Sequence, residues 1–259
     1  MQTEDRVSDR IRGRKAIVVG GTHGMGLATA KKLLERGAEV LLTGRDEGNC
    51  ARVQASLDAR ARVVRSDVSS MAEIDALGQR VEETLGEIDA LFVFAGVAEF
   101  APFHEVSEAS FDLHFAVNTK GAFFTVQRLS PLLRDAGSIT MATVTPATAS
   151  PTMGVYMATK AAVRAFARVM AAELLPRRVR VNTLAPGFID TPTLGVAGLS
   201  PAKREELRTL GDRVTPMRRH GTSDEVADAA LFLAFDATFS TGIELPVDGG
   251  LSEVDAPWG

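Results

Sequence analysis

Short apolar segments alternate with longer amphipathic segments along most of the chain. The apolar segments are apolar nearly throughout, which is typical of parallel strands that helices cover on both faces. Each is bounded by polar residues or glycine. The pattern predicts strands over Ala16 to Gly20, Glu39 to Thr43, Arg62 to Ser66, Ala90 to Ala95, Ser138 to Ala142, Arg180 to Leu184 and Ile243 to Val247.

The segments between these strands have apolar residues at helical spacing. They predict helices over Gly24 to Arg36, Glu47 to Ala59, Met71 to Gly86, Phe111 to Leu133, Val155 to Leu174 and Ser223 to Phe235. Gly37 suits the left-handed position after the first helix, and Ser223 suits an N-terminal cap. Strands alternating with helices predict an α/β fold: a single-domain, Rossmann-like, doubly wound parallel sheet of about seven strands with helices on both faces.

No linker interrupts the pattern, so we expect one domain over residues 14–259 after a polar tail over residues 1–13. Residues 187–222 break the rhythm with prolines and glycines. Long connections in compact domains are usually lids or binding loops, so we predict a substrate loop there. Its apolar residues suggest an apolar pocket wall and its arginines suggest recognition of an acid, and both readings stay open. The residues concerned are Leu194, Val196, Leu199, Leu207, Leu210, Met217, Arg204, Arg208, Arg213 and Arg218.

Composition and charge narrow the class of protein. The chain has 259 residues, 45% of them hydrophobic, and a formal net charge of -4, which argues against a nucleic-acid surface. The short basic clusters at residues 177–180 and 218–220 suggest solvated faces. Cys50 is the single cysteine, the first fifteen residues have no signal-peptide core, and the longest apolar run, Ala90 to Ala98, is too short to span a membrane. We expect a cytoplasmic protein with no membrane partner.

Residues 18–26 read VVGGTHGMG, a glycine-rich turn between the first strand and the first helix. Glycine lets the backbone approach a ligand, and a helix N-terminus attracts phosphate. We therefore predict that Gly20, Gly24 and Gly26 form a cradle for a dinucleotide, together with Thr22 and Met25; a purely structural turn is the alternative. His23 lies within the loop, either against a phosphate or at the surface.

The glycine spacing resembles the TGxxxGxG signature of the classical short-chain dehydrogenase/reductase family, with Val19 in place of threonine. Later motifs extend the resemblance over nearly the whole chain. The resemblance implies a nicotinamide cofactor and hydride transfer between a carbonyl and an alcohol. It also implies a homotetramer or homodimer, because GIELPVDGG matches the C-terminal segment that usually builds the family's tetramer interface.

The end of the second strand indicates which cofactor is used. An acidic residue there would bond the ribose hydroxyls of NAD, whereas arginine attracts the 2'-phosphate of NADP. Gly44 stands where family members that prefer NAD usually have Asp, and Arg45 follows. We predict NADP(H), with NAD(H) less favoured. Arg45 as a solvated turn residue, or paired with Asp46, is the alternative.

The resemblance assigns further cofactor contacts. Asp67, with Val68 beside it, matches the family's adenine-contacting Asp. Ala95 and Gly96 match the second half of the family's NNAG stretch; Phe94 replaces an asparagine, and either its packing compensates or the local geometry differs. At the nicotinamide end, the stretch VNTLAPGFIDTP assigns Pro186, Gly187, Ile189 and Thr191.

Tyr156 and Lys160 lie four residues apart on a predicted helix, so they share one face. An ammonium near a phenol favours the phenolate and is expected to lower the tyrosine pKa, which suits proton exchange with an alkoxide. This YxxxK motif matches the catalytic pair of the family, so both residues are also expected to contact the cofactor. Tyr156 is the only tyrosine of the chain.

Two more residues complete the predicted catalytic set. The family's serine lies thirteen residues before the tyrosine, where this chain has Thr143. Its hydroxyl is expected to bond the substrate carbonyl oxygen; a structural threonine is the alternative, and Thr145 and Thr148 are nearby substitutes. Asn118 resembles the family asparagine that positions the lysine through a water.

No metal motif is present among the four histidines. The leading hypothesis is an NADP(H)-dependent carbonyl reductase or alcohol dehydrogenase acting on a small molecule. A catalytically silent nucleotide sensor or scaffold is the alternative. An epimerase or dehydratase of the same fold is less favoured, because such relatives usually have a larger C-terminal substrate domain.

Overall fold

The computed structural model describes residues 10–145, 150–192, 196 and 200–254. Seven parallel strands form one sheet in the order β3-β2-β1-β4-β5-β6-β9. The predicted doubly wound α/β fold is confirmed. The strands are β1 (Lys15–Val19), β2 (Glu39–Gly44), β3 (Ala61–Arg65), β4 (Ile88–Val93), β5 (Leu133–Ala142), β6 (Arg180–Pro186) and β9 (Glu244–Val247).

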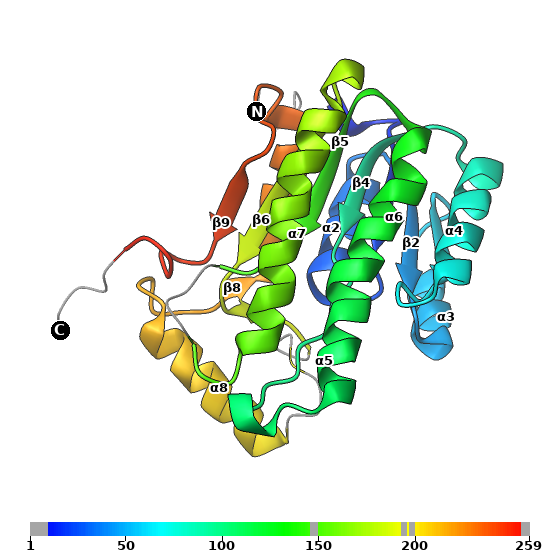
Figure 1. Ribbon diagram of the computed structural model, residues 1–259. Helices are drawn as coiled ribbons and strands as arrows, with labels where there is room; N and C mark the ends of the chain where they lie inside the picture. Colours follow the sequence, from blue (N-terminus) through cyan, green and yellow to red (C-terminus); the bar gives the residue numbers. More distant parts are fainter. Residues whose placement is uncertain (1–9, 146–149, 193–195, 197–199, 255–259) are drawn as a thin grey trace.

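Helices cover both faces of this sheet (Figure 1). Helices α4, α6 and α7 pack with one apolar cluster, and α2, α3 and α9 pack with the other. The helices in the described residues are α2 (Gly24–Glu35), α3 (Glu47–Ser56), α4 (Met71–Thr84), α5 (Glu108–His114), α6 (Ala122–Leu129), α7 (Gly154–Glu173), α8 (Pro201–Val214) and α9 (Ser223–Leu231).

The alternation of side chains along β1 divides the core. Ile17 and Val19 belong to the cluster under α7, while Ala16 and Val18 belong to the cluster under α2. All four side chains are fully buried. A strand with apolar contacts on both faces has no solvent-facing side, which explains why its sequence is apolar throughout.

The long helix predicted over residues 111–133 is wrong in detail. Ser107 caps the start of α5, a π-helical stretch over Phe115–Gly121 follows, and α6 ends at Leu129. Strand β5 then begins at Leu133, where a helix was expected. A π turn has no residue signature of its own, so helical spacing of apolar residues does not show where one is inserted.

Residues 187–222 are not a plain loop, which corrects the prediction. They contain α8 and the short paired strands β7 (Ile189–Asp190) and β8 (Gly221–Thr222). Ser200 caps α8 and Pro201 occupies its first turn. Leu194 and Leu199 lie outside the described residues. In Figure 1, α8 lies below the carboxyl ends of the strands, where a substrate would approach.

Two other expectations change at the ends of elements. Ile11 is fully buried, and the Gly13 amide donates to the Gly37 carbonyl, so the domain begins before residue 14. Gly37 has φ +87°, as predicted for the position after α2. The cap of α9 is Thr222, one residue before the predicted Ser223, and it forms a capping box with Glu225.

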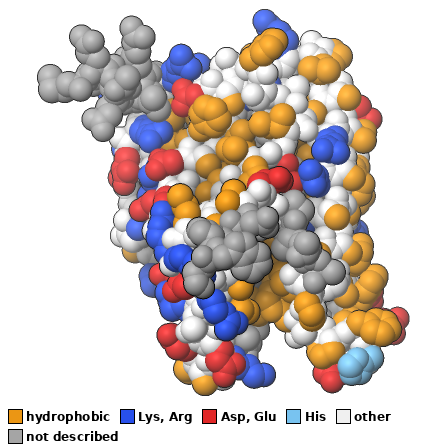
Figure 2. Space-filling view, turned by 90° about the vertical axis from the view of Figure 1, so that its left-hand side faces the viewer, with side chains coloured by type: hydrophobic (Ala, Val, Ile, Leu, Met, Phe, Trp, Pro, Cys, Tyr) orange, Lys and Arg blue, Asp and Glu red, His pale blue; other side chains and the backbone are white. Residues whose placement is uncertain are grey.

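The short basic clusters are only partly solvated: Arg178, Arg218 and Arg219 are exposed as expected, whereas Arg177, Arg180 and His220 have partners within the fold. Arg180 donates to carbonyls at the end of the α9 region, and Arg177 donates to the Ser130 and Leu133 carbonyls. His220 is buried, with Nδ1 2.7 Å from Asp212 Oδ1. On the face shown in Figure 2, basic and acidic side chains are interspersed. No helix within the described ranges is long and apolar enough to cross a membrane.

Candidate functional site

A cleft of about 250 Å³ lies at the carboxyl ends of the central strands. Eight residues predicted to bind the cofactor line it: Gly20, Thr22, His23, Arg45, Asp67, Val68, Ala95 and Gly96. Val196 of the expected apolar wall also lines it, as do Gly44 and Asp46 on either side of Arg45. The lining residues that sequence reasoning missed are Thr43, Asn49, Ser66, Val97, Ala98 and Val117. Thr43 and Ser66 lie at the predicted ends of strands, and the rule that ligands bind there was the available signal.

Two glycines of the predicted cradle cannot carry a side chain. Gly20 has φ +79°, and a Cβ there would lie 2.5 Å from the Ala95 amide nitrogen. A Cβ on Gly26 would lie 2.2 Å from the Gly20 carbonyl oxygen. The backbone therefore folds back on itself at the start of α2 and brings the β4 loop against it.

The N-terminus of α2 carries no competing acid. His23 is its N-cap residue, its side chain forms no capping hydrogen bond, and the first turn has no acidic residue. Amide groups at such an end attract anions, so this end fits a phosphate. His23 is exposed and lines the cleft. Met25 is partly buried and packs against the apolar core.

Gly44 leaves no room for the acidic residue of NAD-preferring relatives. A Cβ there would lie 2.4 Å from Thr22 Oγ1. Arg45 is exposed at the cleft and forms no hydrogen bond or ion pair with another described residue. Asp46 instead caps α3, accepting from the Asn49 amide at 2.6 Å. The alternative in which Asp46 pairs with Arg45 is therefore not what the structure shows.

Asp67 is held in a tight turn beside Val68. Its Oδ1 accepts from the amide and the hydroxyl of Ser69, at 2.9 and 2.7 Å. Burial acts to raise the pKa of Asp67, but these hydrogen bonds and the charge of Arg45 outweigh it and the pKa is lowered. An ionised carboxylate at the cleft wall suits hydrogen bonding to an adenosine.

Tyr156 and Lys160 lie in the first two turns of α7. Lys160 Nζ is 5.9 Å from the centre of the Tyr156 ring and donates to the Ala142 carbonyl at 3.1 Å. Burial raises the pKa of Tyr156 to about 12 and lowers the pKa of Lys160 to about 8. The expected lowering of the tyrosine pKa is therefore not seen, because desolvation dominates at this separation.

Asn118 is fully buried in the π-helical stretch. Its Oδ1 accepts from the Val97 amide at 2.8 Å, and its Nδ2 donates to the Val97 carbonyl at 2.8 Å. A Cβ on Gly96 would lie 3.3 Å from both Asn118 Oδ1 and Lys160 Nζ. The asparagine thus holds the β4 loop beside the lysine, and its support of Lys160 through a water stays a prediction.

The hydroxyl of Thr143 has another partner than the one predicted. Thr143 Oγ1 lies 2.7 Å from Glu244 Oε1 and 3.2 Å from the Leu184 carbonyl oxygen. One hydroxyl proton serves one acceptor well, so this geometry opposes a direct bond to substrate. Thr145 is also committed, to the Ala185 carbonyl and Asp248. Thr148 lies outside the described residues.

Phe94, at the start of the loop after β4, packs against apolar neighbours. Its ring stacks on Phe92 at 6.4 Å between centres, and it packs against the apolar core. The amides of Phe94 and Ala95 both donate to the Val19 carbonyl. Main-chain bonds and ring stacking therefore fix the start of the β4 loop without the polar pair.

The predicted nicotinamide end lies beside the glycine cradle. A Cβ on Gly24 would lie 3.4 Å from Thr191 Cγ2, and Thr191 Oγ1 is buried with no hydrogen-bond partner among the described residues. Pro186 ends β6 and Gly187 packs against Asp248. Ile189 is buried in the apolar core, so only its backbone is available to a ligand.

The comparisons with known proteins agree with this arrangement. A family model described as Enoyl-(Acyl carrier protein) reductase matches residues 19–252. The chain belongs to the classical short-chain dehydrogenase/reductase family, a family of oxidoreductases. The NADP-dependent (R)-specific alcohol dehydrogenase of Lentilactobacillus kefiri is 35% identical over 253 residues, covering 94% of this chain and 98% of that protein.

Other members of the short-chain dehydrogenase/reductase family match over a similar length. The 2-(S)-hydroxypropyl-CoM dehydrogenase 3 of Xanthobacter autotrophicus is 33% identical over 255 residues, covering 96% of this chain and 100% of that protein. A solved structure of a short chain dehydrogenase/reductase family protein has a TM-score of 0.83 and 32% identity, covering 95% of this chain and 100% of that one. The family and the fold are therefore established together.

Proposed function

We propose that the protein is an NADP(H)-dependent oxidoreductase that interconverts a ketone or aldehyde and an alcohol. The observation that carries the proposal is that Lys160, which lies beside Tyr156 on α7, is next to a residue that lines the cleft. The Gly96 backbone, which lines the cleft, lies against Lys160 Nζ. When bound, the nicotinamide supplies or accepts the hydride, and a site that holds both reactants removes most of the entropy cost of their meeting.

The residues present fit a nicotinamide dinucleotide. Among the described residues, Ser66 Oγ in the cleft and Thr191 Oγ1 beside Gly24 are buried without a hydrogen-bond partner. Unpaired buried hydroxyls are costly, and a ligand with sugar hydroxyls and an amide would satisfy them. The glycine cradle would hold the pyrophosphate at the start of α2. Arg45 is free to bind a 2'-phosphate, and the lack of space at Gly44 disfavours an acidic residue there.

In the proposed mechanism, Tyr156 exchanges a proton with the substrate oxygen. With the pKa of Lys160 at about 8, its side chain is mostly the charged ammonium at neutral pH, and we propose that this charge opposes the desolvation that raises the pKa of Tyr156. Asn118 holds the adjoining loop and is proposed to support Lys160 through a water. Thr143 would contribute its hydroxyl only by leaving Glu244.

The substrate is proposed to enter between α8 and the catalytic pair. Two arginines on α8 are already engaged: Arg208 pairs with Asp190 at 2.9 Å and Arg204 donates to the Pro192 carbonyl at 2.8 Å.

We propose a homotetramer or homodimer, supported by exposed apolar side chains on and after α7. Val169 is 57% exposed and Leu175 is 53% exposed.

A silent nucleotide sensor is the second candidate, favoured by the engagement of Thr143 with Glu244. Consumption of NADPH and NADH over a panel of ketones and aldehydes distinguishes the two. The oxidoreductase proposal expects turnover with NADPH that Tyr156→Phe abolishes, with nucleotide affinity retained. Tight NADPH binding without turnover on any compound would favour the sensor, and no nucleotide binding would contradict both.

A further inference from the structure

Three side chains spaced four residues apart hold the loop that follows β4. Ser110 Oγ donates to Glu99 Oε2 at 2.7 Å, and His114 Nε2 accepts from the Glu99 amide at 3.0 Å. The side chain of Asn118 accepts from the backbone amide of Val97 and donates to the backbone carbonyl of Val97, each at 2.8 Å. We refer to Ser110, His114 and Asn118 as the helix ladder. It fixes both ends of the segment from residue 97 to residue 99.

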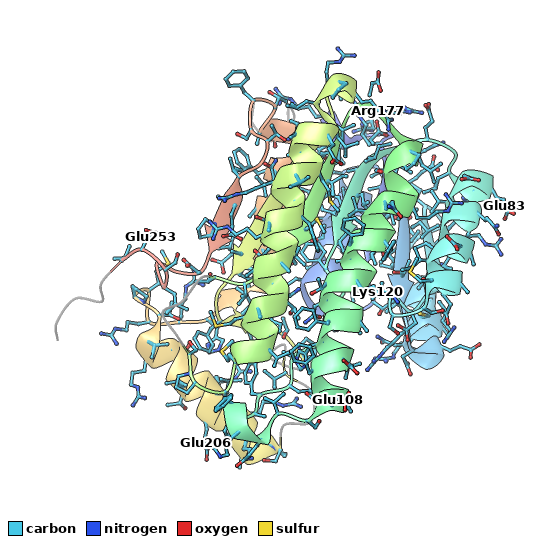
Figure 3. All side chains as sticks on the ribbon, viewed as in Figure 1. Glu83, Glu108, Lys120, Arg177, Glu206 and Glu253 are labelled. Carbon is cyan, nitrogen blue, oxygen red and sulfur yellow. The ribbon has the colours of Figure 1, made fainter. Side chains whose placement is uncertain are left out.

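The π-helical stretch aligns the ladder. In an α-helix a four-residue step rotates a side chain by about 40° from the position directly above. The wider turn of Phe115–Gly121 reduces that drift between His114 and Asn118, so both face the same loop. Figure 3 labels Glu108 and Lys120, which bracket the part of the α5–α6 rod that carries the ladder.

The protonation state of His114 follows from its two partners. Nδ1 is 2.7 Å from the Ser110 carbonyl oxygen, which can only accept, and Nε2 faces the Glu99 amide, which can only donate. The ring is therefore a neutral imidazole with its proton on Nδ1. His114 is fully buried, so both bonds are shielded from water. No other protonation form satisfies both groups.

The segment that the ladder holds reaches the catalytic tyrosine. Residues 95–98 line the nucleotide cleft. Two residues further on, the Phe100 ring lies 6.3 Å from the Tyr156 ring, at an interplanar angle of 59°. The Glu99 amide, which His114 holds, immediately precedes Phe100 in the chain. Its position thus sets where Phe100 packs against Tyr156.

We propose that His114 is a positioning residue for the reaction at Tyr156. Its neutral ring holds Glu99 and thereby keeps Phe100 packed against the tyrosine. Asn118 holds the cleft-lining part of the loop independently, so loss of the His114 bond is expected to affect the chemical step more than nucleotide affinity. The inference rests on the proposed oxidoreductase function.

Two substitutions of His114 test the proposal. His114→Asn keeps a donor near Nδ1 and removes the acceptor for the Glu99 amide, whereas His114→Gln places a carbonyl oxygen near the position of Nε2. Hydrogen exchange of the peptide spanning residues 97–101, kcat and the Kd for NADPH are measured for each. His104→Asn, on an exposed histidine of the same connection, is the matched control.

We expect His114→Asn to lower kcat about tenfold, which corresponds to about 1.4 kcal/mol, with the Kd for NADPH changed less than threefold. Exchange of residues 97–101 is expected to accelerate. His114→Gln should recover most of kcat and protection, and His104→Asn should match the unaltered protein.

Two results would overturn the proposal. One is an unaltered kcat and exchange rate in His114→Asn. The other is an equal loss in both His114 variants together with an equal fall in Tm, which would make the histidine a packing residue only. If the unaltered protein shows no turnover, the proposed function fails by itself. The exchange comparison between the two variants then still decides whether His114 holds the loop.

Discussion

The Thr143 hydroxyl lies 2.7 Å from the carboxylate of Glu244, which comes from the last strand of the sheet. The other oxygen of Glu244 lies 3.1 Å from Arg164 Nε of α7, and the Glu244 side chain is only 7% exposed. A buried carboxylate is tolerated when ion pairs and hydrogen bonds compensate its charge. Thr143 thus joins the end of β5 to β9 beneath α7, one residue after the Ala142 carbonyl that accepts from Lys160.

This relationship predicts that Thr143→Val destabilises the protein while retaining turnover. Valine has nearly the same shape but no hydroxyl, so Glu244 loses a buried donor, at a cost of about 1–3 kcal/mol. Urea unfolding measures the loss, and Thr143→Ser is expected to recover most of it. A loss of turnover above about 100-fold with unchanged stability would instead restore the catalytic role expected from the sequence.

Arg45→Ala is expected to weaken NADPH binding without affecting NADH binding. A hydrogen-bonded ion pair with phosphate contributes about 1.5–3 kcal/mol, so the Kd for NADPH should rise about 10- to 100-fold. Fluorescence titration with both nucleotides measures the effect. Arg62→Ala, at the opposite end of the neighbouring strand, is the control. Equal weakening of both nucleotides would show that Arg45 does not bind the 2'-phosphate.

Because Lys160 is buried, we expect it to lower the stability of the fold while supporting turnover. Burial lowers the pKa of Lys160 from 10.5 to about 8. Between these two values the unfolded chain holds a proton that the native protein has lost, so stability rises with pH across this window. Below pH 8 the native state carries the full free-energy cost of burying the ammonium. At 1.36 kcal/mol per pH unit this cost is up to about 3 kcal/mol.

Lys160→Met is therefore expected to stabilise the fold at pH 7, to flatten the rise in stability between pH 8 and 10, and to abolish turnover. Urea unfolding at pH 7 and 9.5 measures the first two effects, and NADPH consumption measures the third. If Lys160→Met were instead less stable than the unaltered protein at pH 7, with the same pH dependence, this would show that contacts in the native state compensate the charge of the ammonium.

Gly20→Ala is expected to abolish nucleotide binding and to destabilise the fold. The substitution combines a positive φ with a Cβ 2.5 Å from the Ala95 amide nitrogen. Gly86→Ala is the matched control, because Gly86 has φ +67° and no atom within 4 Å of its added Cβ. Both variants carry the backbone penalty, so the difference in their unfolding free energies isolates the close packing. Equal effects would contradict the cradle geometry.

The sheet and most of its helices could be predicted from the sequence, because a strand that is buried on both faces is apolar along nearly its whole length. Helix α8 could not, since its sequence PAKREELRTLGDRV has few apolar residues and mean hydropathy is low there. The cap Ser200 followed by Pro201 was nevertheless a readable start signal. The prolines and glycines of the region favour an irregular loop when the sequence is considered alone.

The positions of Tyr156, Lys160 and Asn118 could be predicted by counting along motifs, and counting also led to Thr143. Counting along the sequence could not predict the hydrogen-bond partner of the Thr143 hydroxyl, because Glu244 lies 101 residues away in the chain. The His114 contact was missed for the same reason: the histidine and Glu99 belong to different elements, and only the folded chain brings them to 3.0 Å.

The most direct test of the central claim is to follow the transferred hydride. NADPH deuterated at both C4 positions is incubated with the protein and the carbonyl panel, and the alcohols formed are analysed by mass spectrometry. The account predicts one deuterium on the new carbinol carbon with the unaltered protein and none with Tyr156→Phe. Saturable NADPH binding without a deuterated alcohol from any compound would contradict it.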